Sequence, residues 1–179
     1  MRKIVLNLAM SLDGYIEGPN GEFDWCFTDQ DYGMNDFLNS ADAIFLGRKS
    51  YETLITAGLE LFAALKIYIF SNTLTTVDVG AEIINSDTFI QRVQEIRNMP
   101  GGHIWLFGGA ELVSTFMAER LINEIVLSVH PVVLGGGKPL FIGKNRTDLM
   151  LLGTEQFSSG LVQLRYTFKP NFDYSMIDF

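Results

Sequence analysis

The stretch AIFLGRKS at residues 43–50 decides the fold, because an apolar strand there runs directly into a turn that begins with glycine. The four apolar residues 43–46 are typical of a strand buried on both faces of a sheet. The turn at 47–50 carries two basic residues, and residues 51–57 favour a helix. A buried strand followed by a helix is the repeating unit of an α/β protein.

The same alternation of strand and helix extends outward from this unit. Toward the N-terminus, residues 4–12 predict a buried strand, 17–29 a long loop and 31–40 a short helix. Further strands are expected at 66–70, 81–84, 103–107, 124–133, 149–157 and 161–168. Helices are expected after Ser86, which is a plausible N-cap, and after Gly109. The last two strands meet at a turn that suits a hairpin, so the pattern predicts a mostly parallel sheet with an antiparallel C-terminal edge.

Composition indicates one globular domain without disulfides. The chain has 179 residues, of which 47% are apolar and 19% charged, with no composition break that would mark a linker. We expect a single domain over residues 1–179, with its core at about 2–169 and a C-terminal tail at 170–179. The single cysteine and the absence of a leader or of a long apolar run favour a cytoplasmic protein. A net charge of −8 argues against nucleic acid and anionic membranes as partners.

Three expected strand ends lead into turns that suit a phosphate group. They are Gly47-Arg48-Lys49-Ser50, Ser71-Asn72-Thr73 and Gly108-Gly109. Free N–H groups at a helix start attract anions, basic side chains add charge, and glycine lets the backbone approach a ligand closely. Ligands of open α/β sheets bind beyond the carboxyl ends of the strands, where all three turns fall. By contrast, GGGK at 135–138 is not a P-loop, because Pro139 follows in place of Ser or Thr.

Four motifs, in this order along the chain, resemble the dihydrofolate reductase superfamily. They are AMSLDGYI at 9–16, LGRKSYE at 46–52, IWLFGGAEL at 104–112 and PVVLGGG at 131–137. The chain looks most like the reductase domain of the riboflavin-biosynthesis deaminase-reductase and its stand-alone relatives. The resemblance implies a dihydrofolate-reductase-like three-layer α/β/α fold.

The resemblance also implies that NADPH is the cofactor and that the first strand and the three turns bind it. The implied residues are Ala9, Ile16, Gly47, Arg48, Lys49, Ser50, Ser71, Asn72, Gly108, Gly109, Ala110 and Glu111. Arg48 would lie nearest the adenosine 2′-phosphate, which distinguishes NADPH from NADH. Ala9 and Ile16 would flank the nicotinamide ring.

A carboxylate on the first helix of dihydrofolate reductases binds the substrate ring and supports its protonation. It precedes the strand-end glycine by sixteen positions, and Asp31 lies sixteen before Gly47. Asp31 is therefore the expected catalytic acid and substrate ligand, with Asp36 as the alternative. Ser128 matches a hydroxyl that helps hold the substrate ring, and Trp25 is an aromatic candidate for stacking on it.

The resemblance implies hydride transfer from NADPH to a C=N bond of a pterin-like or pyrimidine-ribosylamine substrate. The zinc deaminase partner of the riboflavin pathway is absent, because no His-x-Glu or Pro-Cys-x-x-Cys motif occurs, and no metal is expected. A non-catalytic NADP(H)-binding dimeric module is the alternative. The tail at 171–179 is rich in aromatic and aliphatic residues, which often mark an interface, and it favours a homodimer.

Overall fold

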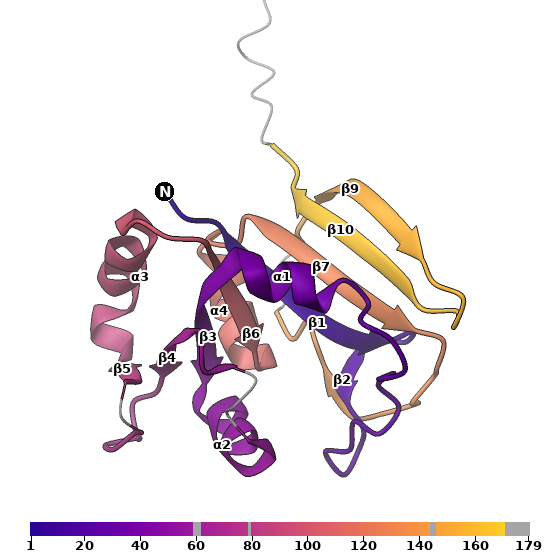
Figure 1. Cartoon of the computed structure of the whole chain (residues 1–179), viewed down its shortest axis with the longest axis horizontal. Helices are drawn as coiled ribbons and strands as arrows, with labels where there is room; N and C mark the ends of the chain where they lie inside the picture. Colours follow the sequence, from indigo (N-terminus) through magenta and orange to yellow (C-terminus); the bar gives the residue numbers. More distant parts are fainter. Residues whose placement is uncertain (59–61, 79, 144–145, 171–179) are drawn as a thin grey trace, which may run out of the picture.

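The computed structural model describes residues 1–58, 62–78, 80–143 and 146–170. One eight-stranded sheet has the order β5-β4-β3-β6-β1-β7-β10-β9 (Figure 1). Its strands are β1 Ile4–Ser11, β3 Ala41–Gly47, β4 Lys66–Phe70, β5 Glu82–Ile84, β6 His103–Gly108, β7 Glu124–His130, β9 Leu149–Gln156 and β10 Val162–Phe168. The helices are α1 Met34–Ser40, α2 Arg48–Ala57, α3 Phe89–Asn98 and α4 Ala110–Ala118.

The sheet is parallel from β5 to β7, and only its C-terminal edge is antiparallel. β1 lies at the centre and pairs in parallel with both β6 and β7. β10 then runs antiparallel to β7, and β9 antiparallel to β10. The predicted hairpin joins these last two strands, with Gly160 at a positive φ of 88°. The predicted architecture is therefore confirmed.

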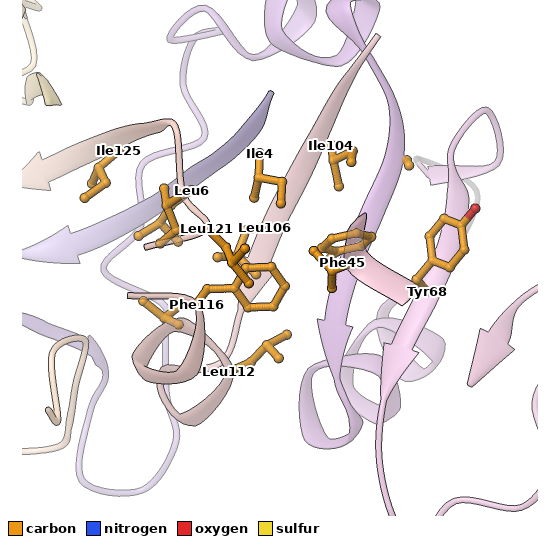
Figure 2. Packing of buried hydrophobic residues seen from close by; sticks show 14 of the residues in the cluster. Ile4, Leu6, Phe45, Tyr68, Ile104, Leu106, Leu112, Phe116, Leu121 and Ile125 are labelled. Carbon is orange, nitrogen blue, oxygen red and sulfur yellow. The ribbon is translucent and has the colours of Figure 1, made fainter. Parts of the chain in front are cut away.

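Helices cover both faces of the sheet, because the buried strands present apolar side chains to both sides. On one face, Phe45 and Leu106 pack against Phe116 of α4 (Figure 2). On the other face, Ile44 and Trp105 pack with side chains of α1 and α2. Figure 1 shows α1 in front of the sheet. Phe45, Leu106 and Phe116 are fully buried, so this layer is a close-packed core.

Several element boundaries differ from the expectation by one to three residues, and three of these differences have a clear physical cause. α1 begins at Met34 instead of 31, because Tyr32 and Gly33 adopt positive φ angles of 51° and 75° that no α-helix contains. β7 ends at His130, since the following Pro131 has no N–H to donate to a neighbouring strand. Ser86 is not the N-cap: it starts a 3-10 turn whose cap is Asn85, and α3 begins three residues later.

A short strand that the sequence pattern did not indicate leads into the predicted loop at 17–29. β2 (Tyr15–Glu17) pairs antiparallel with β8 (Lys138–Pro139), outside the main sheet. Gly137 makes this pairing possible, because its φ is 126° and a Cβ atom there would collide with the Glu17 carbonyl oxygen. The small sheet therefore brings the first and fourth motifs together.

Candidate functional site

A cavity of about 480 Å³ opens where β3, β4 and β6 end. All three predicted phosphate-binding turns contribute to it, as the topology requires. Of the predicted cofactor residues, it is lined by Gly47, Arg48, Lys49, Ser50, Ser71, Asn72, Gly109, Ala110 and Glu111. Ala9, Ile16 and Gly108 are not among its lining residues. The three turns are thus brought together, and the roles implied for these residues stay predictions.

Two helix N-termini meet in this cavity. α2 has Gly47 as its N-cap and α4 has Gly109, and neither glycine has a side chain to compete for the first N–H groups of its helix. A Cβ atom on Gly47 would lie 3.5 Å from the Gly108 carbonyl oxygen and 3.6 Å from the Gly109 nitrogen. The two helix starts are therefore neighbours, and both direct the positive end of the helix dipole toward the same space.

The basic side chains of the cavity are partly neutralised by carboxylates. Arg48 donates to both carboxylate oxygens of Glu52, one helical turn along α2, at 2.7 and 3.0 Å. Lys138, which ends the GGGK stretch rejected as a P-loop and was given no site role, also lines the cavity and forms an ion pair of 3.1 Å with Glu17. Its position depends on the β2–β8 pairing, so no local sequence signal could reveal it.

The polar side chains of the turn after β4 mostly shape the backbone. Ser71 Oγ accepts hydrogen bonds from the N–H groups of Thr73 and Leu74. Asn72 Oδ1 accepts from the N–H of Ser86 at 2.8 Å, which ties this turn to the segment after β5. Both residues still line the cavity. These hydrogen bonds fix the conformation of the turn where it borders the cavity.

Asp13 links the first motif to the fourth. Its carboxylate accepts from the N–H groups of Leu134 and Gly135 and from the hydroxyl of Ser11. The Ser11 hydrogen bond, with these backbone donors, lowers the pKa of Asp13. Ser11 Oγ also accepts from the N–H of Tyr15. The SLDG turn and the triple-glycine turn are therefore bound to each other beside the strand that carries Ala9 and leads to Ile16.

The predicted substrate residues lie on the face of the sheet that α1 covers. Ser128 is the register partner of both Ala9 and Gln163. Gln163 Nε2 lies 3.4 Å from Ser128 Oγ and 3.4 Å from the carbonyl oxygen of Tyr32, so this row extends to the start of α1. Asp31 itself is exposed, and its Oδ1 accepts from the N–H of Asn35, in the first turn of α1, at 3.0 Å. It is not buried and does not line the cavity, and its catalytic role stays a prediction.

His130 anchors the loop before α1. Its Nε2 accepts from the N–H of Phe27 at 3.1 Å and its Nδ1 lies 3.0 Å from the Ser128 carbonyl oxygen, which assigns the ring proton to Nδ1. The rings of Trp25 and Phe27 pack edge-on against the imidazole, with distances between ring centroids of 5.3 and 5.0 Å. These contacts hold Trp25 against the sheet, and its contact with substrate stays a prediction.

We expect the loop anchor to weaken in acid. Burial lowers the pKa of His130 below its ordinary value, so the unfolded chain binds a proton more readily than the folded one. The contribution of neutral His130 to the free energy of unfolding is complete above the pKa of the unfolded chain, about 6.5. As the pH falls below this value, the free energy of unfolding decreases with a slope of at most about 1.4 kcal/mol per pH unit. Urea unfolding between pH 7.5 and 5 measures this slope.

A His130→Gln variant should lose that slope, whereas the matched His103→Gln variant should retain it. Equal slopes in wild type and His130→Gln would contradict the anchoring role of the imidazole.

Two kinds of site are not found among residues 1–58, 62–78, 80–143 and 146–170. No three His, Cys, Asp or Glu side chains there come close enough together to hold a metal ion. Nor is any helix in those ranges both long and apolar enough to cross a membrane.

Burial, with Asp24 nearby, raises the pKa of the Cys26 thiol to about 11, so this cysteine is protonated at neutral pH.

The parallel sheet, its antiparallel edge and the cavity at the strand ends define a dihydrofolate-reductase-like α/β protein. The chain belongs to the RibD C-terminal domain family, whose model matches residues 2–163. It is 46% identical over 178 residues to the uncharacterized protein YyaP of Bacillus subtilis (strain 168), covering 92% of this chain and 94% of that protein.

Solved structures agree with this assignment. A putative riboflavin biosynthesis protein from Shewanella sp. PV-4 has a TM-score of 0.79 and 25% identity, covering 95% of this chain and 100% of that chain. Dihydrofolate reductase from Enterococcus faecalis, complexed with NADP(H), has a TM-score of 0.70 and 11% identity, covering 94% and 97%. Family and fold together support a reductase of the riboflavin-pathway or dihydrofolate reductase type.

Proposed function

We propose that this chain is an NADPH-dependent reductase that transfers hydride to a C=N bond of a pterin-like or pyrimidine-ribosylamine substrate. One observation carries the proposal: two helix N-termini and three basic side chains converge on one cavity in a protein with a net charge of −8. A concentration of positive potential in an acidic protein is expected where an anionic ligand binds.

The residues of the cavity fit a phosphorylated dinucleotide. The glycine N-caps of α2 and α4 leave room for phosphate oxygens next to the backbone N–H groups. Ser50 supplies a hydroxyl donor, and Arg48 stands at the start of α2, where it would hold a 2′-phosphate. Bound there, NADPH would supply the hydride, which is chemistry that no side chain can provide. The Enterococcus dihydrofolate reductase of the same fold binds NADP(H), which supports this choice.

The protein's own residues would position the two rings and manage one proton. Ala9 has a small side chain beside Ser128, so it leaves space for a flat ring over β1 and β7. Ser128 and Gln163 offer hydrogen bonds to a heterocycle on the same face of the sheet. Asp31, or a water that it orients, would favour the protonated and more electrophilic imine. Positioning of this kind accounts for much of the rate in such reactions.

The proposal is tested by titrating the purified protein with NADPH and NADH while nicotinamide fluorescence is followed. Dihydrofolate or a pyrimidine-ribosylamine is then added, and oxidation is read at the nicotinamide absorbance. Selective NADPH binding with oxidation by one substrate would support the reductase and identify its branch. Binding without oxidation by either heterocycle would favour the non-catalytic module, and no binding of either nucleotide would contradict the proposal.

We further propose that the protein is a homodimer joined along β9. Among the described residues this strand pairs only with β10, and Met150, Leu151 and Leu152 are about half exposed on it. Such an apolar edge strand is a ready template for pairing with another strand. Antiparallel pairing with the same strand of a second copy would give a closed twofold interface. The tail at 171–179, on which the sequence prediction rested, lies outside the described residues.

Replacing Leu151 and Leu152 together by lysine should convert the dimer to a monomer, because charged lysines on an edge strand oppose pairing. Light scattering after size-exclusion chromatography measures the mass. The control is Ile90→Lys on α3, which is similarly exposed and should leave the mass unchanged. A monomeric wild type would refute the interface.

A further inference from the structure

Lys138 occupies a position in the cavity that the phosphate-binding turns alone do not explain. A Cβ atom on Gly109 would lie 3.4 Å from Lys138 Nζ and 3.5 Å from Ser50 Oγ. The ammonium group and the Ser50 hydroxyl therefore converge over Gly109, the N-cap of α4. Lys138 enters this space from β8, which lies outside the main sheet.

Glu17 holds this ammonium group in the structure. Its Oε1 lies 3.1 Å from Lys138 Nζ, across the β2–β8 pair. About a third of each side chain is exposed, so this ion pair is partly solvated and weak. A doubly charged pyrophosphate placed over Gly109 would offer the same ammonium more negative charge and stronger hydrogen bonds.

The geometry points to Lys138 as a pyrophosphate-binding residue for which Glu17 and the cofactor compete. This inference rests on the proposed function, because it concerns the same cavity and the same dinucleotide. When the cofactor binds, the ammonium group exchanges one anionic partner for another. The backbone pairing of β2 with β8 can persist, since Glu17 and Lys138 are also register partners through their main chains.

Glu17 could compete with the cofactor for Lys138, or it could orient Lys138 for the cofactor. These two roles predict opposite changes in NADPH affinity when Glu17 loses its charge. If Glu17 competes, Glu17→Gln frees the ammonium group and tightens NADPH binding, by about 3-fold for a weak exposed pair. Lys138→Gln should weaken NADPH binding by about 10-fold, as expected for one charge-assisted hydrogen bond. In the double variant Glu17 has no partner to compete for, so its affinity should match that of Lys138→Gln within about 2-fold.

The experiment measures the Kd of NADPH by nicotinamide fluorescence at fixed salt for wild type, the three variants and Lys3→Gln. Lys3 is an exposed lysine just before β1, at the opposite end of the sheet from the cavity, and it controls for the loss of one positive charge. Thermal unfolding of each variant shows that it is folded. The expected order of affinity is Glu17→Gln, then wild type and Lys3→Gln together, then Lys138→Gln and the double variant together.

Weaker binding by Glu17→Gln would overturn the competition, because Glu17 would then orient Lys138 for the cofactor. Equal affinity of Lys138→Gln and wild type would overturn the role of Lys138, while selective NADPH binding by wild type would still uphold the proposed function. If the wild type binds neither NADPH nor NADH, both the role of Lys138 and the proposed function are contradicted.

Discussion

Replacing Arg48 by alanine should weaken NADPH binding by about 10- to 100-fold and NADH binding by less than about 3-fold. This range corresponds to the loss of a hydrogen bond to a charged group, about 1.5–3 kcal/mol. The reason is geometric, since Arg48 uses only Nη1 for Glu52 and its Nε and Nη2 groups remain available to a 2′-phosphate. Because NADH lacks that phosphate, its affinity depends on the helix N-termini and on the other cations.

Nicotinamide fluorescence titrations at one salt concentration measure both affinities. Arg165→Ala is the matched control: Arg165 also pairs with a carboxylate, that of Glu124, and lies on β10 away from the cavity. It should leave both affinities near those of wild type. An equal loss for NADPH and NADH in Arg48→Ala would contradict contact with the 2′-phosphate and would assign Arg48 to the phosphates that both nucleotides share.

Asp31→Asn should lower kcat by about 100-fold, at the lower end of the range for a lost general acid, and should leave the Kd of NADPH nearly unchanged. The substitution separates charge from structure, because the Oδ1 atom of asparagine can still accept from the N–H of Asn35. The start of α1 should therefore persist. Single-turnover oxidation of bound NADPH by the heterocycle measures the effect.

Asp36→Asn is the natural comparison, since Asp36 is likewise exposed and lies in the first turn of α1. If Asp36 is the acid, the effects of the two variants will be exchanged. Unchanged turnover in Asp31→Asn would remove the assignment of Asp31, whose side chain faces solvent in the structure.

The sequence predicted the sheet well because its strands are marked by local composition. Residues 43–46 and 104–107 are apolar and border glycine, and both form buried parallel strands. The errors arose where the backbone departs from regular geometry. α1 begins after Tyr32 and Gly33 because both have positive φ angles. A positive φ is uncommon for tyrosine and cannot be predicted from composition alone.

The candidate site was predictable to the extent that it consists of strand ends. Topology places the turns at Gly47, Ser71 and Gly109 together once the strand order is known. Lys138 escaped prediction because its partners are distant in the chain: Glu17 is 121 residues away. Acidic residues are also common at solvated helix starts, and the spacing of Asp31 to Gly47 does not say whether neighbours cover it, so the spacing alone left its exposure open.

The central position of β1 has a consequence for biosynthesis. β1 is flanked by β6 and β7, so its two hydrogen-bonding edges stay without these partners until residues 103–130 have been made. Pairings this distant in sequence close large loops and slow folding. A nascent chain that ends before these residues carries an apolar strand without its partners, and such unpaired strands favour aggregation.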